Sequence, residues 1–129
     1  MDPPGPGDRL GRSQAGRRDH SRVVARGDVI WADLGGSAGT RPVCILTREA
    51  AIAVSTSVTC APITRTIRGI RSEVEVGPAE GLPTESVITC DNVLTIPADY
   101  LVGEPLGHLD RERRAALDAA LRYALDIRY

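Results

Sequence analysis

Short apolar runs separated by turn residues dominate the chain after residue 22. Residues 23–34 form the first run, residues 43–46 follow Pro42 directly, and residues 58–63 lead into Thr64. Short apolar runs bounded by turn residues are typical of buried β-strands. Proline cannot donate to a strand ladder and biases the preceding residue towards extended geometry, so Pro42 marks the start of a strand. We therefore predict three strands here, with Arg41 at the mouth of the second.

The second half of the chain predicts three further strands. Residues 72–76 alternate, with Val74 and Val76 expected inward and Glu73 and Glu75 outward. A turn over residues 77–84 precedes a strand over 85–90, and residues 92–97 form a sixth strand that ends in a proline. Residues 49–56, between the second and third strands, favour a loop or a short helical turn.

One long helix is predicted near the end of the chain. Asp110 is a favourable N-cap, Glu112 lies in the first turn, and the pattern continues to about residue 127. An apolar stripe at helical spacing is expected to face the sheet and consists of Leu117, Ala120, Leu121, Ala124 and Leu125.

Short strands, close turns and one terminal helix predict a mainly β (α+β) fold. The expected form is a small SH3-like barrel of about five to seven bent antiparallel strands with a C-terminal helix. A chain of 129 residues is one domain. Residues 1–22 contain many Gly and Pro and few apolar residues, so we expect a disordered tail there and a folded domain over residues 23–129.

Composition adds few constraints. The net charge is −1, and all sixteen basic residues are arginine, whose planar fork suits phosphate. The odd number of cysteines and the lack of a C-x-x-C pair favour buried reduced thiols at Cys44, Cys60 and Cys90 over disulfides or a zinc site. No segment has the pattern of a membrane span or a signal peptide, so we expect a cytoplasmic protein without membrane contact.

Four segments occur in an order and spacing that resemble a known family. They read GDVIWADL (27–34), TRPVCILT (40–47), APIT (61–64) and SVITCDN (86–92), with the basic loop TRTIRGIR (64–71) after the third. Over roughly residues 25–128 the chain resembles the PemK/MazF family of toxin endoribonucleases. The resemblance also implies the barrel of PemK and CcdB toxins. The glycine-rich first loop, 35–39, lacks the acidic residue that many family members carry there.

The resemblance implies a sequence-specific endoribonuclease that cuts single-stranded RNA without metal or cofactor. The expected ends are a 2′,3′-cyclic phosphate and a 5′-hydroxyl. Further implications are a homodimer with a groove across its two-fold axis, a cognate MazE-like antitoxin, and contact with DNA only through that antitoxin. On the family pattern Arg41 and Thr64 are the catalytic pair. The residues expected to bind RNA are Thr40, Arg65, Thr66, Arg68, Arg71 and Asn92.

The chemistry of Arg41 and Thr64 fits this implication. An arginine fork binds non-bridging phosphate oxygens, and a threonine hydroxyl donates beside it. Because the pKa of arginine exceeds about 12, Arg41 is a poor general base and is assigned to charge stabilisation, with proton donation to the leaving 5′-oxygen as a further role. His20 and His108 are far from Arg41 in sequence, and His108 is expected to be a surface or structural residue.

Each assignment has a plainer alternative. Arg41 could form a surface salt bridge, Thr64 could be an ordinary strand residue, and the loop over 64–71 could be merely solvated. Asn92 could form a turn, and Trp31 is expected in the core or at a dimer seam rather than as a base-stacking platform. For the whole protein, the alternatives are a CcdB-like gyrase poison and a non-catalytic SH3-like nucleic-acid-binding module.

Overall fold

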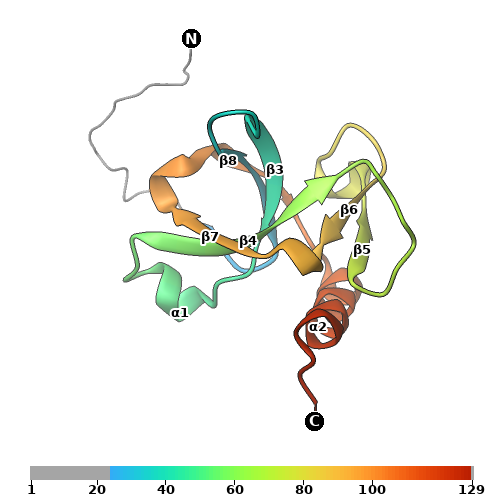
Figure 1. Ribbon diagram of the computed structural model, residues 1–129. Helices are drawn as coiled ribbons and strands as arrows, with labels where there is room; N and C mark the ends of the chain where they lie inside the picture. Colours follow the sequence, from blue (N-terminus) through green and yellow to red (C-terminus); the bar gives the residue numbers. More distant parts are fainter. Residues whose placement is uncertain (1–23, 129) are drawn as a thin grey trace.

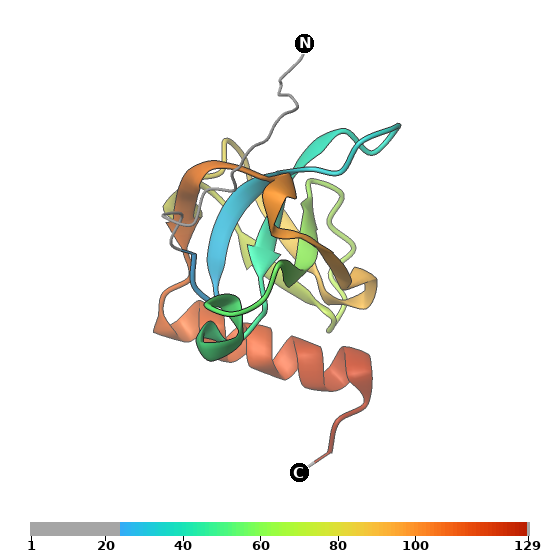
Figure 2. The ribbon, with the colours of Figure 1, turned by 90° about the vertical axis from the view of Figure 1, so that its left-hand side faces the viewer.

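The computed structural model describes residues 24–128 of the chain. The predicted tail over residues 1–22, and His20 with it, lies outside the described residues. Within residues 24–128, seven antiparallel strands form one sheet, and helix α2 (Arg111–Leu125) packs beneath it (Figure 1). Figure 2 shows α2 crossing under the strands, while the loop between the first two strands projects from the body.

The strands are β2 (Asp28–Asp33), β3 (Thr40–Ile45), β4 (Ser57–Thr64), β5 (Glu73–Val76), β6 (Ser86–Thr89), β7 (Leu94–Pro97) and β8 (Leu101–His108). Neighbours follow the order β5-β6-β4-β3-β2-β8, and β7 pairs with β4 away from this path. The predicted mainly β fold with a C-terminal helix is confirmed. The sheet is bent but not closed, because β5 and β8 remain at its two ends.

β4 connects the two parts of the sheet. Its residues up to Pro62 pair with β3 and β7, whereas Ile63 and Thr64 pair with β6. Pro62 has no amide hydrogen for a ladder, and it lies where the strand changes partners. Its carbonyl accepts a hydrogen bond of 2.8 Å from the Thr89 hydroxyl on β6. This change of partner carries Thr64 to the end of the sheet where β3 begins.

The helices follow local signals. The segment after β3, for which the pattern favours a loop or a short helical turn, contains α1 (Glu49–Ile52). Three 3-10 turns follow as η1 (Pro78–Glu80), η2 (Cys90–Asn92) and η3 (Ala98–Tyr100). Asp110 caps α2, since its carboxylate accepts a 2.8 Å hydrogen bond from the Arg113 amide. The helix ends at Leu125, where Asp126 takes a left-handed conformation.

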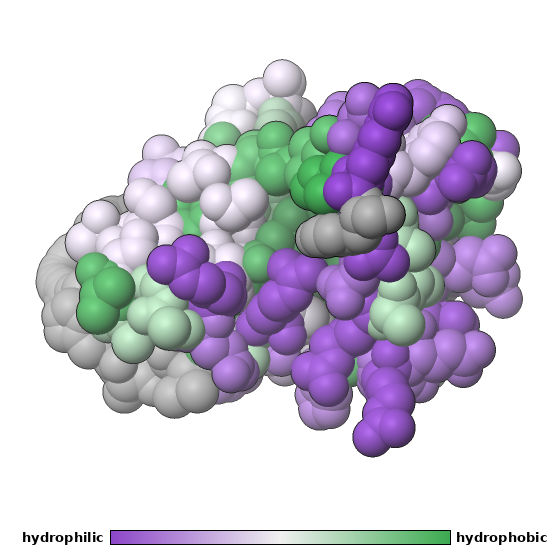
Figure 3. Space-filling model, turned by 90° about the horizontal axis from the view of Figure 1, so that it is seen from below, coloured by the Kyte–Doolittle hydropathy of each residue, from purple (hydrophilic) through white to green (hydrophobic). Residues whose placement is uncertain are grey.

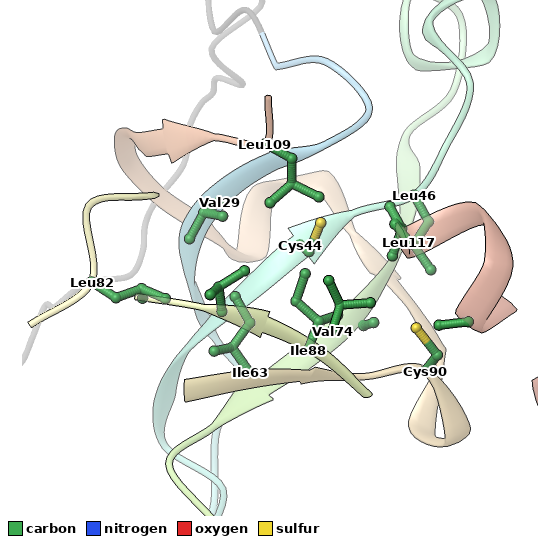
Figure 4. Close-up of a cluster of buried hydrophobic side chains, with 13 residues drawn as sticks. Val29, Cys44, Leu46, Ile63, Val74, Leu82, Ile88, Cys90, Leu109 and Leu117 are labelled. Carbon is green, nitrogen blue, oxygen red and sulfur yellow. The ribbon is translucent and has the colours of Figure 1, made fainter. Parts of the chain in front are cut away.

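Two apolar clusters hold the fold. One lies between the strands and α2, where side chains including Cys44, Ile63, Leu82 and Leu117 point towards one another (Figure 4). The other lies on the opposite side of β2 and β3 and includes Ile30. Alternation along each strand places successive residues in different clusters, which explains why both faces of the central strands are apolar.

The structure corrects three details of the sequence prediction. The first strand begins at Asp28 because Gly27, with φ of +94°, forms a turn before it. The pattern predicts no strand over β8, which pairs with β2 through a register shift. Leu125 was expected in the buried stripe of α2 but is 57% exposed, since the last turn extends beyond the sheet.

Candidate active site

Arg41 lies one residue inside β3, opposite Ala32 of β2. Its Nε donates a 2.8 Å hydrogen bond to the carbonyl of Ala38 in the projecting loop. Among residues 24–128, no carboxylate forms an ion pair with Arg41, and neither terminal guanidinium nitrogen has a hydrogen-bond partner. The backbone therefore fixes the inner nitrogen of an exposed fork and leaves the two outer nitrogens to donate elsewhere. The salt-bridge alternative for Arg41 has no support in this part of the chain.

Thr64 is the last residue of β4 and pairs with Val87 of β6. The β3–β4 ladder aligns Val43 with Pro62. The ladder ends at this pair, and Arg41 and Thr64 each lie two residues beyond it, at the same end of the ladder. The Thr64 hydroxyl oxygen accepts a 3.1 Å hydrogen bond from the amide of Thr66. Because a hydroxyl can accept and donate at once, its hydrogen remains available to a ligand.

A hollow of about 550 Å³ opens where β3 begins and β4 ends. Five residues from the predicted site line it: Thr40, Arg41, Thr64, Arg65 and Thr66. Its volume lies within the range of small-molecule sites, about 300–1,000 Å³. We call it the Arg41 hollow. The structure thus brings together the predicted catalytic pair and half of the residues expected to bind RNA.

The other residues expected to bind RNA lie outside the Arg41 hollow. The backbone amides of Arg68 and Gly69 donate to the Glu73 carboxylate, which shapes the basic loop. Arg71 stacks on the ring of Tyr123, at 4.3 Å from the ring centroid, in a second hollow at the end of α2. Asn92 is exposed at the end of η2. Their contact with RNA stays a prediction.

One wall of the Arg41 hollow is not predicted by the sequence pattern and is made by Leu82, Pro83, Thr84 and Ser86. This segment is anchored behind by η1, where the buried Glu80 carboxylate accepts a 2.7 Å hydrogen bond from the Gly77 amide. Arg113 of α2 reaches to 4.0 Å from the same carboxylate. The sequence around these residues indicates only a turn over 77–84 followed by an apolar strand, and this pattern does not show which part of the fold the turn faces.

Gly81 and Gly107 let the wall segment approach β8 closely. A side chain at Gly81 would place its first carbon 2.2 Å from the Leu106 carbonyl oxygen, and one at Gly107 would come within 2.5 Å of the Glu80 carbonyl oxygen. Gly81 also has φ of +88°, a conformation that glycine adopts without steric cost. Glycine at these positions therefore allows two backbone segments to touch directly.

The cysteines are placed in the core and not in the hollow. Cys44, Cys60 and Cys90 are free and buried, as predicted. Burial raises the pKa of the Cys44 thiol to about 12 and the pKa values of Cys60 and Cys90 to about 11. A thiol with such a pKa is protonated near neutral pH and is a poor nucleophile. His108 is exposed at the end of β8, as expected.

The described residues, 24–128, show neither a metal site nor a membrane-spanning helix. No group of three or more His, Cys, Asp and Glu side chains is arranged to hold a metal ion there. In the same part of the chain, no helix combines the length and apolarity needed to cross a membrane. Seen from below, hydrophilic side chains cover much of the surface around an apolar patch (Figure 3).

Residues 25–125 match the family of PemK-like, MazF-like toxins of type II toxin–antitoxin systems. The match spans most of the chain, so this protein belongs to that family. Among the relatives, the endoribonuclease MazF3 of Mycobacterium tuberculosis is 46% identical over 87 residues, which are 67% of this chain and 84% of the relative. The probable endoribonuclease MazF5 of the same species is 39% identical over 105 residues, 81% of this chain and 94% of the relative.

Solved structures agree with this placement. The Mycobacterium tuberculosis toxin MazF-mt6 superposes with a TM-score of 0.73 at 41% identity, over 79% of this chain and 99% of that one. A mycobacterial endoribonuclease, solved in complex with its cognate antitoxin, superposes with a TM-score of 0.73 at 31% identity, over 83% of this chain and 99% of the other. The family resemblance drawn from the four sequence segments is therefore confirmed.

Proposed function

We propose that this protein is a metal-independent endoribonuclease toxin that cuts single-stranded RNA at a short sequence. The observation that carries the proposal is the shared lining of the Arg41 hollow by Arg41, Thr64 and the start of the basic loop. Membership of the PemK/MazF family and the endoribonuclease relatives support the same activity.

The reaction follows from what the two side chains offer. The 2′-hydroxyl of the RNA attacks the adjacent phosphorus and loses its proton to water, and the bond to the 5′-oxygen breaks. The products are a 2′,3′-cyclic phosphate and a 5′-hydroxyl. The free guanidinium nitrogens of Arg41 stabilise the charge that builds on the non-bridging oxygens, and the Thr64 hydroxyl donates beside them. Arg41 also donates a proton to the leaving 5′-oxygen and regains one from solvent, which balances the proton that the 2′-hydroxyl gave to water. Much of the acceleration then comes from aligning the attacking and leaving oxygens.

The basic loop supplies affinity before the chemistry begins. Thr40, Arg65 and Thr66 lie in the hollow and would hold the strand next to the cut. Arg68, Arg71 and Asn92 lie further away and would meet more distant nucleotides. With few aromatic residues in the chain, sequence recognition relies mainly on hydrogen bonds to a small number of exposed bases.

The proposed partners follow from the same site. Two copies form a homodimer whose groove holds the RNA, and a MazE-like antitoxin with a flexible acidic segment covers the groove and its arginines. Contact with DNA occurs only through the antitoxin. The related endoribonuclease solved in complex with its cognate antitoxin supports an antitoxin as partner. We place the action of the toxin in the cytoplasm, where its RNA substrates are made and used.

Purified protein incubated with a long, protein-free RNA in excess EDTA tests this function. We expect discrete fragments with 2′,3′-cyclic phosphate ends, because neither side chain needs a metal. Arg41→Ala should slow cleavage strongly, whereas Arg48→Ala, which removes an exposed arginine outside the hollow, should not. Restoration of a chelated, inactive sample by Mg²⁺ would overturn metal independence.

The same assay separates the alternatives. A gyrase poison would leave protein-free RNA intact. A non-catalytic binding module would retain RNA and lose affinity in Arg41→Ala, but would produce no fragments in either form.

A further inference from the structure

Trp31 lies in an unusual position for the one tryptophan of the chain. It is on the inner strand β2, opposite Pro42 of β3 and Val102 of β8. Its neighbours Ile30 and Ala32 are completely buried, yet Trp31 is only half-buried and lines the Arg41 hollow. A large aromatic side chain is therefore open to the site from the middle of the sheet.

The register shows how the indole and the guanidinium reach the same hollow. Strand residues alternate between faces, so Trp31 shares the face of Pro42, and Arg41 shares the face of Ala32. The Arg41 hollow lies at the start of β3, where side chains from both faces border it. A nucleotide held there could place its phosphate at Arg41 and turn its base towards Trp31.

The lining around Trp31 has the chemistry of a base-binding site. Pro42, Ile63 and Leu82 add apolar surface, and the hydroxyl-bearing Thr84 and Ser86 lie on the wall. A nucleobase combines a flat apolar face with a polar edge, and proteins bind exposed bases by stacking and edge hydrogen bonds. A phosphate site alone would not need this apolar side.

We propose that Trp31 stacks on the nucleobase next to the phosphate bound by Arg41, and so sets part of the cleavage sequence. This inference rests on the proposed RNA cleavage. The described tyrosines, Tyr100 and Tyr123, do not line the hollow, so Trp31 is its only aromatic among the described residues. Loss of one base–aromatic stack weakens binding roughly 5- to 140-fold.

Replacement of Trp31 separates stacking from a core or dimer-seam role. Trp31→Phe keeps a ring, Trp31→Leu keeps apolar bulk without one, and Tyr100→Leu removes an exposed aromatic outside the hollow as a control. Cleavage of a random-sequence RNA pool, with sequencing of the fragment ends, reports the preferred bases. KM and kcat are then measured on an oligonucleotide that spans the wild-type cut, while thermal unfolding and size-exclusion chromatography report folding and association.

We expect Trp31→Leu to raise KM roughly 5- to 140-fold, to change kcat less, and to relax the preference at one nucleotide beside the cut. Trp31→Phe should retain that preference, and Tyr100→Leu should behave as wild type. An unchanged cut pattern and KM in Trp31→Leu would overturn the proposal. So would a loss of activity that coincides with a changed oligomeric state, since that result assigns Trp31 to the seam between subunits.

A second measurement does not depend on cleavage. Wild-type protein is titrated with a labelled, fully 2′-O-methylated RNA pool, which lacks the attacking hydroxyl. Binding is followed by anisotropy of the RNA, and Trp31 emission is read directly because the chain has no other tryptophan. Quenched emission supports stacking even if natural RNA remains uncut, which would count against the nuclease assignment alone. Unchanged emission on saturation would refute the stack.

Discussion

Replacement of Arg41 by lysine should reduce turnover strongly although the positive charge is kept. In the structure, Nε of Arg41 is bound to the Ala38 carbonyl at 2.8 Å, and the outer nitrogens are left to hold phosphate. Lysine has one ammonium group and cannot do both with the same geometry. The lysine ammonium could donate to the Ala38 carbonyl or to the phosphate, but it could not bind the carbonyl and both phosphate oxygens together.

The size of the effect follows from the donors that are lost. Removing one preorganised donor from a site of charge build-up lowers kcat by about 10²–10³. Because lysine retains part of the electrostatic attraction, we expect the lower end, about 10²-fold, with a smaller change in KM. Single-turnover cleavage of an RNA oligonucleotide that spans a mapped cut measures this directly.

Arg65→Lys is the matched control, since Arg65 is exposed and lines the same hollow at the start of the basic loop. A residue that only holds the strand should lose less than about tenfold, mainly in KM. An Arg41→Lys enzyme within about threefold of wild type, less than 1 kcal/mol in barrier height, would refute the fork as the source of charge stabilisation.

Three further outcomes are expected. Gly81→Ala should lower the melting temperature clearly more than Gly103→Ala. Both positions have positive φ, but only at Gly81 would the added carbon clash, at 2.2 Å from the Leu106 carbonyl oxygen. Equal losses in thermal unfolding would argue against this close approach. The free energy of unfolding should fall as pH rises from about 9 towards about 12, because burial raises the pKa of the Cys44 thiol to about 12 while the unfolded thiol ionises near 9. Denaturant midpoints measured across this pH range should fall, and they should fall less steeply in a Cys44→Ala variant. Arg71→Ala should raise KM for RNA less than Arg65→Ala, since Arg71 stacks on an α2 ring outside the Arg41 hollow; the reverse order would place the RNA path over α2.

Local patterns were enough to predict most elements of the fold. Alternation placed Val74 and Val76 inside, and they are 3% and 4% exposed. Asp110 at the helix start acts as the cap that its type and position predicted. β8 was not predicted because Gly103, Pro105 and Gly107 interrupt the alternation of apolar and polar residues along it. Its pairing with β2 also contains a register shift, which no local pattern in the sequence indicates.

The site could be predicted only in part. Arg41 and Thr64 were recognisable because they occupy the catalytic positions of the PemK/MazF pattern, and each lies two residues beyond the same end of the β3–β4 ladder. The wall made by Leu82, Pro83, Thr84 and Ser86 depends on contacts between distant segments, such as Gly81 against β8, and so does the exposure of Trp31 to the hollow. The sequence also did not indicate that the basic loop extends beyond the Arg41 hollow. The Gly69 amide donates to the Glu73 carboxylate, and Arg71 stacks on Tyr123 outside the hollow.

The central claim is that Arg41 and Thr64 act on the same scissile phosphate. A double-mutant cycle with Arg41→Ala, Thr64→Val and the double variant, measured as single-turnover cleavage rates in EDTA, tests it most directly. When two residues act as a unit, the double variant loses far less activity than the sum of the losses in the two single variants, expressed as free energies. We predict that the double variant is scarcely slower than Arg41→Ala alone. Fully additive losses would show that the two side chains act independently and would contradict the account.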